Sequence, residues 1–376
     1  MRESLLAGDA PRVIAFYLPQ YHPIPENDAW WGKGFTEWTN VTKARPLFRG
    51  HYQPHLPADL GFYDLRVAEA REAQADLARQ YGVSGFCYYH YWFSGKRLLH
   101  RPFDEVLTSG QPDFPFCLCW ANENWTRIWD GGGSEVLMEQ TYSEQDDLAH
   151  IRWLANAFAD PRYIRIENKP LFIIYRAHEL PDIRKTTAIW RNECRRLGIG
   201  EIFLCRVDTG TDVLPPSEVG LDAAVEFQPE FASLAKLLSL RRLRLRQWRW
   251  NDVRFFLRRK LLDDNINVQS YRHLVSSMSR RVQPNYLRFP CVTPSWDNSP
   301  RRRRNPIVFV GSSPKLFHQW LVETLAKLMK FRDTPRILFL NAWNEWAEGN
   351  YLEPDQRYGK AHLEALREAL LTASSR

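Results

Sequence analysis

Short apolar runs recur along the 376-residue chain and alternate with segments whose apolar residues fall on one helical face. Uninterrupted apolar runs of this length are typical of strands buried on both faces of a parallel sheet. The runs predict eight strands, at Val13–Leu18, Gly85–Tyr91, Phe116–Trp120, Leu171–Tyr175, Ile202–Val207, Ala223–Phe227, Cys291–Thr293 and Ile337–Leu340.

Helical patterns occupy most of the intervals between these strands. One helix is predicted over residues 64–81, with Asp64 as its N-cap and Gly82 beyond its end. Ser143 and Asp146 resemble a capping box, and an apolar stripe follows them as far as Phe158. Further helices are predicted at Pro181–Leu197, Ser313–Phe331 and Ala361–Leu371.

Eight strands that alternate with helices predict an α/β fold, a (β/α)8 TIM barrel formed by residues 1–376 as a single catalytic domain. A doubly wound open sheet is the alternative, but no glycine-rich phosphate loop follows the first strand. A stretch at about 229–288 is far longer than an ordinary crossover. Its leucines alternate with arginines, which predicts a basic helical insertion late in the barrel.

Polar and aromatic side chains cluster where the predicted strands end. In barrel enzymes the active site is built from the loops at the carboxyl ends of the strands. We therefore expect these residues to contact a ligand, and a carbohydrate fits best because sugars stack on aromatic faces. The candidate substrate-binding residues are Tyr17, Gln20, Tyr21, His22, Trp31, Glu37, Trp38, Tyr89, His90, Tyr91, Trp120, Asn122, Glu123, Asn124, Trp125, Arg127, Glu226, Trp296, Asp297, Asn344 and Trp346. Glu37, Glu123, Glu226 and Asp297 could alternatively form salt bridges to Arg127 and Arg206.

The last predicted strand leads into two carboxylates three residues apart, Glu345 and Glu348. A pair of carboxylates is the usual means of cutting a glycosidic bond, and a separation of about 5–6 Å suits retention of configuration. Residues three apart on a straight strand face opposite sides. Both acids can therefore reach one cleft only if the chain turns after Glu345, and Gly349 makes such a turn plausible. Trp343 and Trp346 either floor a sugar subsite or wedge the loop.

The net charge of +7 is concentrated in two basic segments, Arg241–Lys260 and Arg301–Arg304. The first could be a solvated helix face, a peripheral contact with anionic membrane lipid, or a site for acidic polysaccharide. Nucleic acid is the weakest of these alternatives, because the charge does not follow a recognition helix. The second segment either grips a negatively charged sugar substituent or forms an exposed loop.

Six scattered cysteines lack the spacing of a zinc site, which favours free buried thiols over disulfides. His22, His51, His55 and His90 lie on separate predicted elements, so we expect hydrogen bonding and no metal or cofactor. Neither a signal peptide nor an apolar run of about 18 residues is visible, which predicts a cytoplasmic location.

Five motifs in order make the chain similar to a known family: FYLPQYH, WWGKGFTEWTNV, GFCYYHYWF, WANENWTRIWDG and NAWNEWAEGNYLEPD. Together they resemble the WbsX-type family of polysaccharide-cluster proteins, which is related to glycoside hydrolase family 99, the endo-α-mannosidases and endo-α-mannanases. The resemblance is weakest over residues 228–287. It implies a (β/α)8 barrel that acts on α-linked, mannose-like sugars with retention. By the same resemblance, Glu345 is the general base that takes the proton of the sugar's own 2-hydroxyl, giving a 1,2-anhydro sugar, and Glu348 is the general acid.

Three functions remain open on the sequence. The acid pair favours a retaining glycoside hydrolase or transglycosidase. The absence of a secretion signal favours a cytoplasmic glycosyltransferase of surface polysaccharide (O-antigen or capsule) biosynthesis, although no DxD pair or glycine-rich diphosphate loop is present. The third alternative is a carbohydrate-binding barrel without catalysis.

Overall fold

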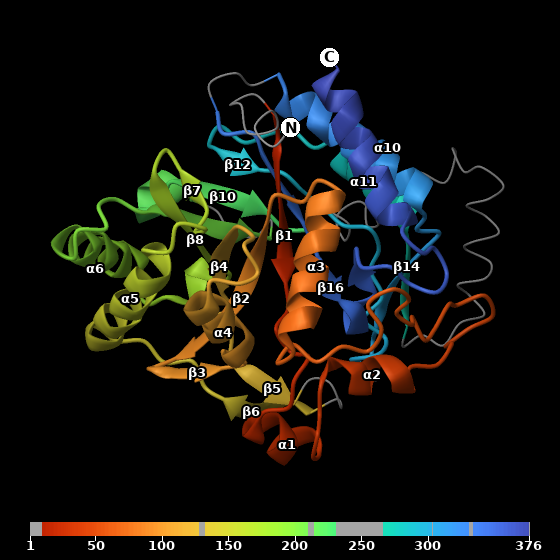
Figure 1. Ribbon diagram of the computed structural model, residues 1–376, viewed down its shortest axis with the longest axis horizontal. Helices are drawn as coiled ribbons and strands as arrows, with labels where there is room; N and C mark the ends of the chain where they lie inside the picture. The colour runs from red at the N-terminus through yellow and green to blue at the C-terminus, as the bar shows by residue number, and fades with distance from the viewer. Residues whose placement is uncertain are drawn as a thin grey trace, which may run out of the picture.

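A computed structural model describes residues 10–127, 132–209, 214–230, 266–302, 304–330 and 334–375 (Figure 1). The basic helices predicted around Arg241–Lys260 lie outside these residues. Within them, no helix is both long enough and apolar enough to cross a bilayer.

The centre of the molecule is a ring of parallel strands. Its members, in spatial order, are β1 (Arg12–Tyr17), β2 (Gly85–Phe93), β4 (Phe116–Trp120), β8 (Lys169–Ile174), β9 (Phe203–Asp208), β10 (Ala223–Glu226), β12 (Arg288–Phe289) with β13 (Cys291–Val292), and β15 (Ile337–Leu340). The pairing of β1 with both β2 and β15 is parallel, so Ile14 lies opposite Gly85 on one side and Phe339 on the other. Each of the eight predicted strands matches one of these positions.

The seventh strand of the ring is interrupted at Pro290. Its first half, β12, pairs with β10, and its second half, β13, pairs with β15. Proline has no N–H to donate to a sheet ladder, but the Pro290 carbonyl still accepts a hydrogen bond from the Phe339 amide at 2.9 Å. The interrupted strand thereby joins β10 to β15 and completes the ring, which confirms the predicted (β/α)8 barrel.

Helices surround the ring (Figure 1). They are α1 (Pro25–Trp31), α2 (Glu37–Lys43), α3 (Ala68–Gln80), α4 (Arg101–Ser109), α5 (Glu144–Phe158), α6 (Ile183–Arg196), α9 (Tyr271–Met278), α10 (Pro314–Leu328) and α11 (Ala361–Ser374). Five of them, α3, α5, α6, α10 and α11, match the predicted helices to within four residues at each end. The Ser143 side chain caps α5 by accepting a hydrogen bond from the Asp146 amide. The predicted Asp64 cap is wrong, because α3 begins at Ala68 and Asp64 instead binds the amide and guanidinium of Arg66.

Shorter strands and 3-10 turns lie outside the ring of barrel strands. They are β3 (Lys96–Leu98), β5 (Trp125–Arg127), β6 (Gly132–Met138), β7 (Arg165–Ile166), β11 (Asn267–Ser270), β14 (Ile307–Val310), β16 (Asn344–Glu345), β17 (Asn350–Tyr351), and the 3-10 turns η2 (Ala177–Glu179), η3 (Pro216–Val219) and η5 (Trp346–Glu348). In Figure 1, β1 points toward the end of the barrel where α1, α2, β5 and β6 gather.

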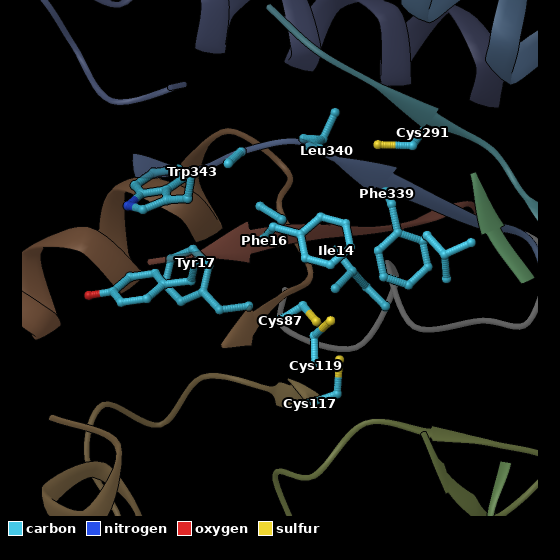
Figure 2. Packing of buried hydrophobic residues seen from close by; sticks show 14 of the residues in the cluster. Ile14, Phe16, Tyr17, Cys87, Cys117, Cys119, Cys291, Phe339, Leu340 and Trp343 are labelled. Carbon is cyan, nitrogen blue, oxygen red and sulfur yellow. The ribbon is translucent and has the colours of Figure 1, made fainter. Parts of the chain in front are cut away.

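An aromatic layer fills the barrel interior. The Phe16 ring contacts those of Tyr89, Phe227 and Phe339 at centroid distances of 5.6, 5.7 and 5.6 Å. Because successive side chains of a strand face opposite sides, Tyr17 points outward, and Figure 2 shows its ring extending away from Phe16. The Tyr17 hydroxyl donates to Gln74 Oε1 on α3 at 2.6 Å. Tyr17 therefore belongs to the packing between barrel and helix, and not to the ligand site expected from the sequence.

The six cysteines are all buried and free, as predicted. Cys87, Cys117 and Cys119 lie together on the neighbouring strands β2 and β4 (Figure 2).

Candidate active site

A cavity of about 760 Å³ opens at the carboxyl end of the barrel strands. Every strand of the ring contributes to its wall, either from its own end or from the loop that follows it. The predicted site residues on this wall are Gln20, Trp31, Tyr89, Tyr91, Glu123, Asn124, Trp125, Trp296, Glu345 and Glu348. The cavity thus lies where barrel enzymes place their active sites.

The last strand turns as it enters the cavity, as the sequence predicts. Backbone angles of φ −80° and ψ 63° at Glu345 end β16, and the 3-10 turn η5 follows. Gly349 ends the turn in the left-handed region, at φ +57°. A Cβ at this position would lie 2.9 Å from Asp297 Cβ, so only glycine fits without a shift. The turn brings Glu345 and Glu348 to the same cavity.

One guanidinium connects three carboxylates at this turn. Arg301 Nη1 lies 2.8 Å from Glu348 Oε1, while Nη2 lies 2.7 Å from Glu37 Oε1 and 3.3 Å from Glu345 Oε2. The side chain of Glu37 is fully buried, those of Glu345 and Arg301 are 8% and 11% exposed, and that of Glu348 is 22% exposed. Glu348 is therefore the acid most open to a ligand.

Burial dominates the electrostatics of this cluster. It raises the pKa of Glu345 to about 8, with Arg301 opposing the shift and the charges of Glu348 and Glu37 adding to it. Burial also raises the pKa of Glu37, against the opposing effect of Arg301. For Arg301 burial lowers the pKa, but the three carboxylates outweigh it and hold the pKa well above the ordinary value. The guanidinium is thus charged, and the Glu345 carboxyl retains its proton at neutral pH.

Glu37 also fixes the backbone between the two acids. Its Oε1 atom accepts a hydrogen bond from the Ala347 amide at 3.1 Å, and Gln20 Nε2 donates to its Oε2 at 3.4 Å. A residue of α2 near the start of the chain therefore positions the turn that holds the acid pair.

The geometry of the turn also depends on side chains behind it. Asn344 binds the backbone of Leu18, accepting from its amide at 2.7 Å and donating to its carbonyl at 3.0 Å. The Trp346 ring stacks on Tyr351 at 3.7 Å, and its indole N–H donates to Glu353 at 2.6 Å. Trp343 is fully buried as well. Both tryptophans are therefore wedges behind the loop and do not floor the cavity.

Many of the predicted contact residues do not line this cavity. They are Tyr17, Tyr21, His22, Glu37, Trp38, His90, Trp120, Asn122, Arg127, Glu226, Asp297, Asn344 and Trp346. His90, for example, stacks on Trp153 at 4.7 Å and contacts His150 Nε2 at 3.0 Å. Asn122 binds the Arg176 backbone in both directions, so it ties two strand ends together. Proximity to a strand end predicts the region but not which way each side chain points.

The salt-bridge partners expected for the other acids need correction. Glu123 pairs with Arg176 at 2.6 Å, and Glu226 pairs with Arg281 at 2.8 Å. Arg127 contacts Glu135 at 2.9 Å. The partners of Glu123 and Glu226 lie 53 and 55 residues away in the chain, which is why the local pattern did not identify them.

Asp297 is held beneath the turn. His51 Nε2 and Gln53 Nε2 lie 2.6 and 2.7 Å from its Oδ2 atom, and its own amide donates to the Glu348 carbonyl at 2.6 Å. Burial opposes ionisation of Asp297, but the hydrogen bond and charge of His51 outweigh burial and lower its pKa. Across the described residues, no group of three or more His, Cys, Asp or Glu side chains is arranged to hold a metal ion.

Sequence reasoning missed two kinds of cavity residue. Tyr175 and Phe227 end their strands in apolar runs, so they were assigned only to strands. Arg301 was recognised in its basic run, but its contacts with the acid pair were not. Its neighbour Arg302 also lines the cavity.

The chain is similar to several known proteins. A family model described as Glycosyltransferase WbsX matches residues 13–366. Two proteins named uncharacterized protein WxcX, from two strains of Xanthomonas campestris pv. campestris, are 46% identical over 362 residues, or 96% of this chain. The chain spans about half the length of these curated relatives, with 50% of each covered.

Solved structures share the fold at low sequence identity. A glycoside hydrolase-like protein superposes with a TM-score of 0.57 and 16% identity over 98% of this chain and 97% of that chain. A GH99 endo-alpha-mannosidase from Bacteroides thetaiotaomicron gives a TM-score of 0.56 and 13% identity, over 97% of this chain and 99% of that chain. At such identities the likeness establishes the barrel fold alone.

Proposed function

The chain belongs to the glycosyltransferase WbsX family, and from that premise we propose that it is a retaining glycoside hydrolase or transglycosidase acting on α-linked, mannose-like sugars of a polysaccharide or oligosaccharide. The observation that supports this most strongly is the pair Glu345 and Glu348, which share one cavity and one guanidinium. Two carboxylates on one cleft are what glycosidic bond cleavage requires.

On substrate binding the proton that Glu345 holds at neutral pH moves to Glu348. In the first step, the Glu345 carboxylate then takes the proton of the sugar's 2-hydroxyl. The 2-oxygen then attacks C1 and forms a 1,2-anhydro sugar, while Glu348 gives its proton to the departing glycosidic oxygen. Glu348 suits the acid role because it is the more exposed of the two. Arg301 suits the role of an electrostatic brace, since a fixed positive charge beside both acids needs no reorganisation during the reaction.

In the second step, the Glu348 carboxylate takes a proton from water, and the water oxygen attacks C1. The anhydro ring opens, and the 2-oxygen recovers its proton from Glu345. Each step inverts C1, so the product retains the original configuration. A sugar hydroxyl in place of water gives transglycosylation with the same residues.

A second candidate is a glycosyltransferase of surface polysaccharide biosynthesis, which the description of the matching family favours. It differs from the first in requiring an activated donor such as a nucleotide sugar. A cytoplasmic location, and contact with anionic lipid through the basic segment Arg241–Lys260, belong to the same proposal.

The test incubates the purified protein with α-linked mannose oligosaccharides, with and without nucleotide sugars. We expect products of retained configuration without any nucleotide. Turnover that strictly requires a nucleotide donor would overturn the hydrolase proposal in favour of the transferase. If Glu345→Gln and Glu348→Gln leave the product profile unchanged, the chain is a binding barrel or acts through other residues.

The roles of the two acids can be distinguished by the leaving group of the substrate. Glu348→Gln should lose activity on an oligosaccharide by about 10²–10⁴-fold, the typical worth of acid–base catalysis. An aryl α-mannoside with an acidic phenol leaves without protonation, so its first step should survive in Glu348→Gln. Glu345→Gln should be inactive on both substrates. Equal losses on both substrates for both variants would contradict the assigned roles.

A further inference from the structure

The charges on the cavity wall are paired, with one exception among the described residues. Arg301 contacts three carboxylates, Arg176 pairs with Glu123 at 2.6 Å, and Glu230 pairs with Arg281 at 2.7 Å. Arg302 lines the same cavity and is half-buried, yet no carboxylate of the described chain lies within ion-pair distance of it. A guanidinium on a cavity wall without a protein anion is free to bind an anion of the ligand.

The backbone that carries Arg302 is held firmly. Its amide and that of Arg301 both donate to the Asn298 carbonyl, at 2.9 and 3.1 Å. Asn298 is in turn fixed to Ile307, donating to its carbonyl at 3.2 Å and accepting from its amide at 2.7 Å. The buried Arg301 side chain anchors the same turn. Binding through Arg302 therefore orders only one side chain, which keeps the entropic cost of binding low.

We propose that Arg302 forms a subsite for a negatively charged substituent of the glycan, a carboxylate or a phosphate. A guanidinium binds either group through two parallel hydrogen bonds. The inference rests on the proposed action on sugars and specifies the substrate class, acidic in place of neutral glycans.

The negative charge of Glu37, Glu345 and Glu348 requires the anionic substituent that binds Arg302 to lie away from the glycosidic bond that is cut. Three carboxylates face one guanidinium there, so a further anion beside Glu345 and Glu348 would be repelled. Arg302 is next to this cluster in the chain but is not part of it. The charged group therefore belongs to a neighbouring sugar or to the leaving group, and not to the ring whose C1 reacts.

The experiment measures binding, so it does not depend on turnover. Three matched probes are titrated into the whole chain by calorimetry: an α-linked mannobiose, the same disaccharide oxidised at C6 of one ring to a carboxylate, and its 6-phosphate. The variants are Arg302→Gln, Arg302→Lys, and Arg304→Gln as the control, because Arg304 is exposed and does not line the cavity. Circular dichroism verifies that each variant folds.

We expect the wild type to bind at least one charged probe on the order of tenfold more tightly than the neutral one, corresponding to one charge-assisted contact. Arg302→Gln should abolish that preference, Arg302→Lys should restore part of it, and Arg304→Gln should keep it. Selectivity for the carboxylate assigns an acidic sugar, and selectivity for the phosphate assigns a phosphorylated or nucleotide-linked one.

Equal binding of all three probes by the wild type, or equal behaviour of Arg302→Gln and Arg304→Gln, would overturn the subsite. Because no catalysis is measured, Arg302-dependent selectivity without any turnover would keep the subsite and reject the proposed hydrolase. Turnover of neutral oligosaccharides without Arg302-dependent selectivity would keep the proposed hydrolase and reject the subsite.

Discussion

Replacing Glu37 by Gln should change the pH dependence of catalysis without touching either acid of the pair. The proposed reaction needs one proton between Glu345 and Glu348. Since the pKa of Glu345 is about 8, kcat/KM on an oligosaccharide should fall as the pH rises above about 8. Glutamine keeps the oxygen that accepts from the Ala347 amide and from Arg301, so the turn stays in place.

The magnitude follows from the contacts of Arg301. Glu37 and Glu345 both contact Nη2, at 2.7 and 3.3 Å, so the two oxygens are near neighbours. Two unit charges about 6 Å apart interact by about 2.8 kcal/mol at an effective dielectric constant of about 20, equivalent to about two pKa units. Burial raises the pKa of Glu37 itself, which reduces its average charge. The alkaline limb should therefore move to lower pH by about one to two units.

The assay is kcat/KM from pH 5 to pH 10 on an α-linked mannose oligosaccharide. The matched control is Glu193→Gln, since Glu193 is also held by arginines, Arg152 and Arg196, but lies on α6 away from the cavity. The control should leave the limb at the wild-type pH. An aryl α-mannoside with a good leaving group should show no alkaline fall, because it needs no acid. A limb that stays in place or moves upward in Glu37→Gln would refute the electrostatic argument.

The remaining predictions concern the turn, a buried acid and the basic insertion. Gly349→Ala should lower the free energy of unfolding by about 1–3 kcal/mol, as expected for a strained positive φ, and should reduce kcat more than it affects binding; an unchanged denaturant midpoint would contradict this. Burial raises the pKa of Glu353 to about 7 against hydrogen bonds from Trp346, Gln74 and Tyr63. The folded state thus binds this proton more tightly than the unfolded state, so stability falls as the pH rises from about 4.5 to about 7. Glu353→Gln should flatten the fall in melting temperature over that range, and a slope equal to wild type would refute the assignment. The chain should co-sediment at low salt with vesicles rich in anionic lipid. Replacing the arginines of Arg241–Lys260 with glutamine should abolish this co-sedimentation. Equal sedimentation of the variant and the wild type would exclude that segment as the lipid-binding site.

The strands could be predicted because each is buried on both faces and therefore reads as a continuous apolar run. The interruption of the seventh strand at Pro290 could not be predicted. The segment from Leu287 to Val292 pairs first with β10 and then with β15, and strand pairing depends on tertiary structure. The Asp64 cap failed for a related reason. Arg66, two residues away, offers that carboxylate a stronger local partner than the helix start does.

The site divides in the same way. The two acids were located correctly on one cavity because the apolar run, the polar turn and Gly349 are adjacent in sequence. Tyr17 was placed wrongly because alternation along a strand decides which side chain faces inward, and Phe16 occupies that position. The partnership of Arg301 with Glu37, 264 residues away, leaves no local pattern.

The contact between Arg301 and Glu37 influences which acid of the pair holds a proton before the reaction begins. Three carboxylates around a single guanidinium, in a buried site, leave an excess negative charge that is relieved by keeping a proton. In the resting state the proton resides on Glu345, whose pKa is about 8. The proposed reaction needs the same number of protons but needs that proton on Glu348. A bound sugar therefore has only to move the proton from one acid to the other, and the guanidinium that touches both stabilises the negative charge in either position.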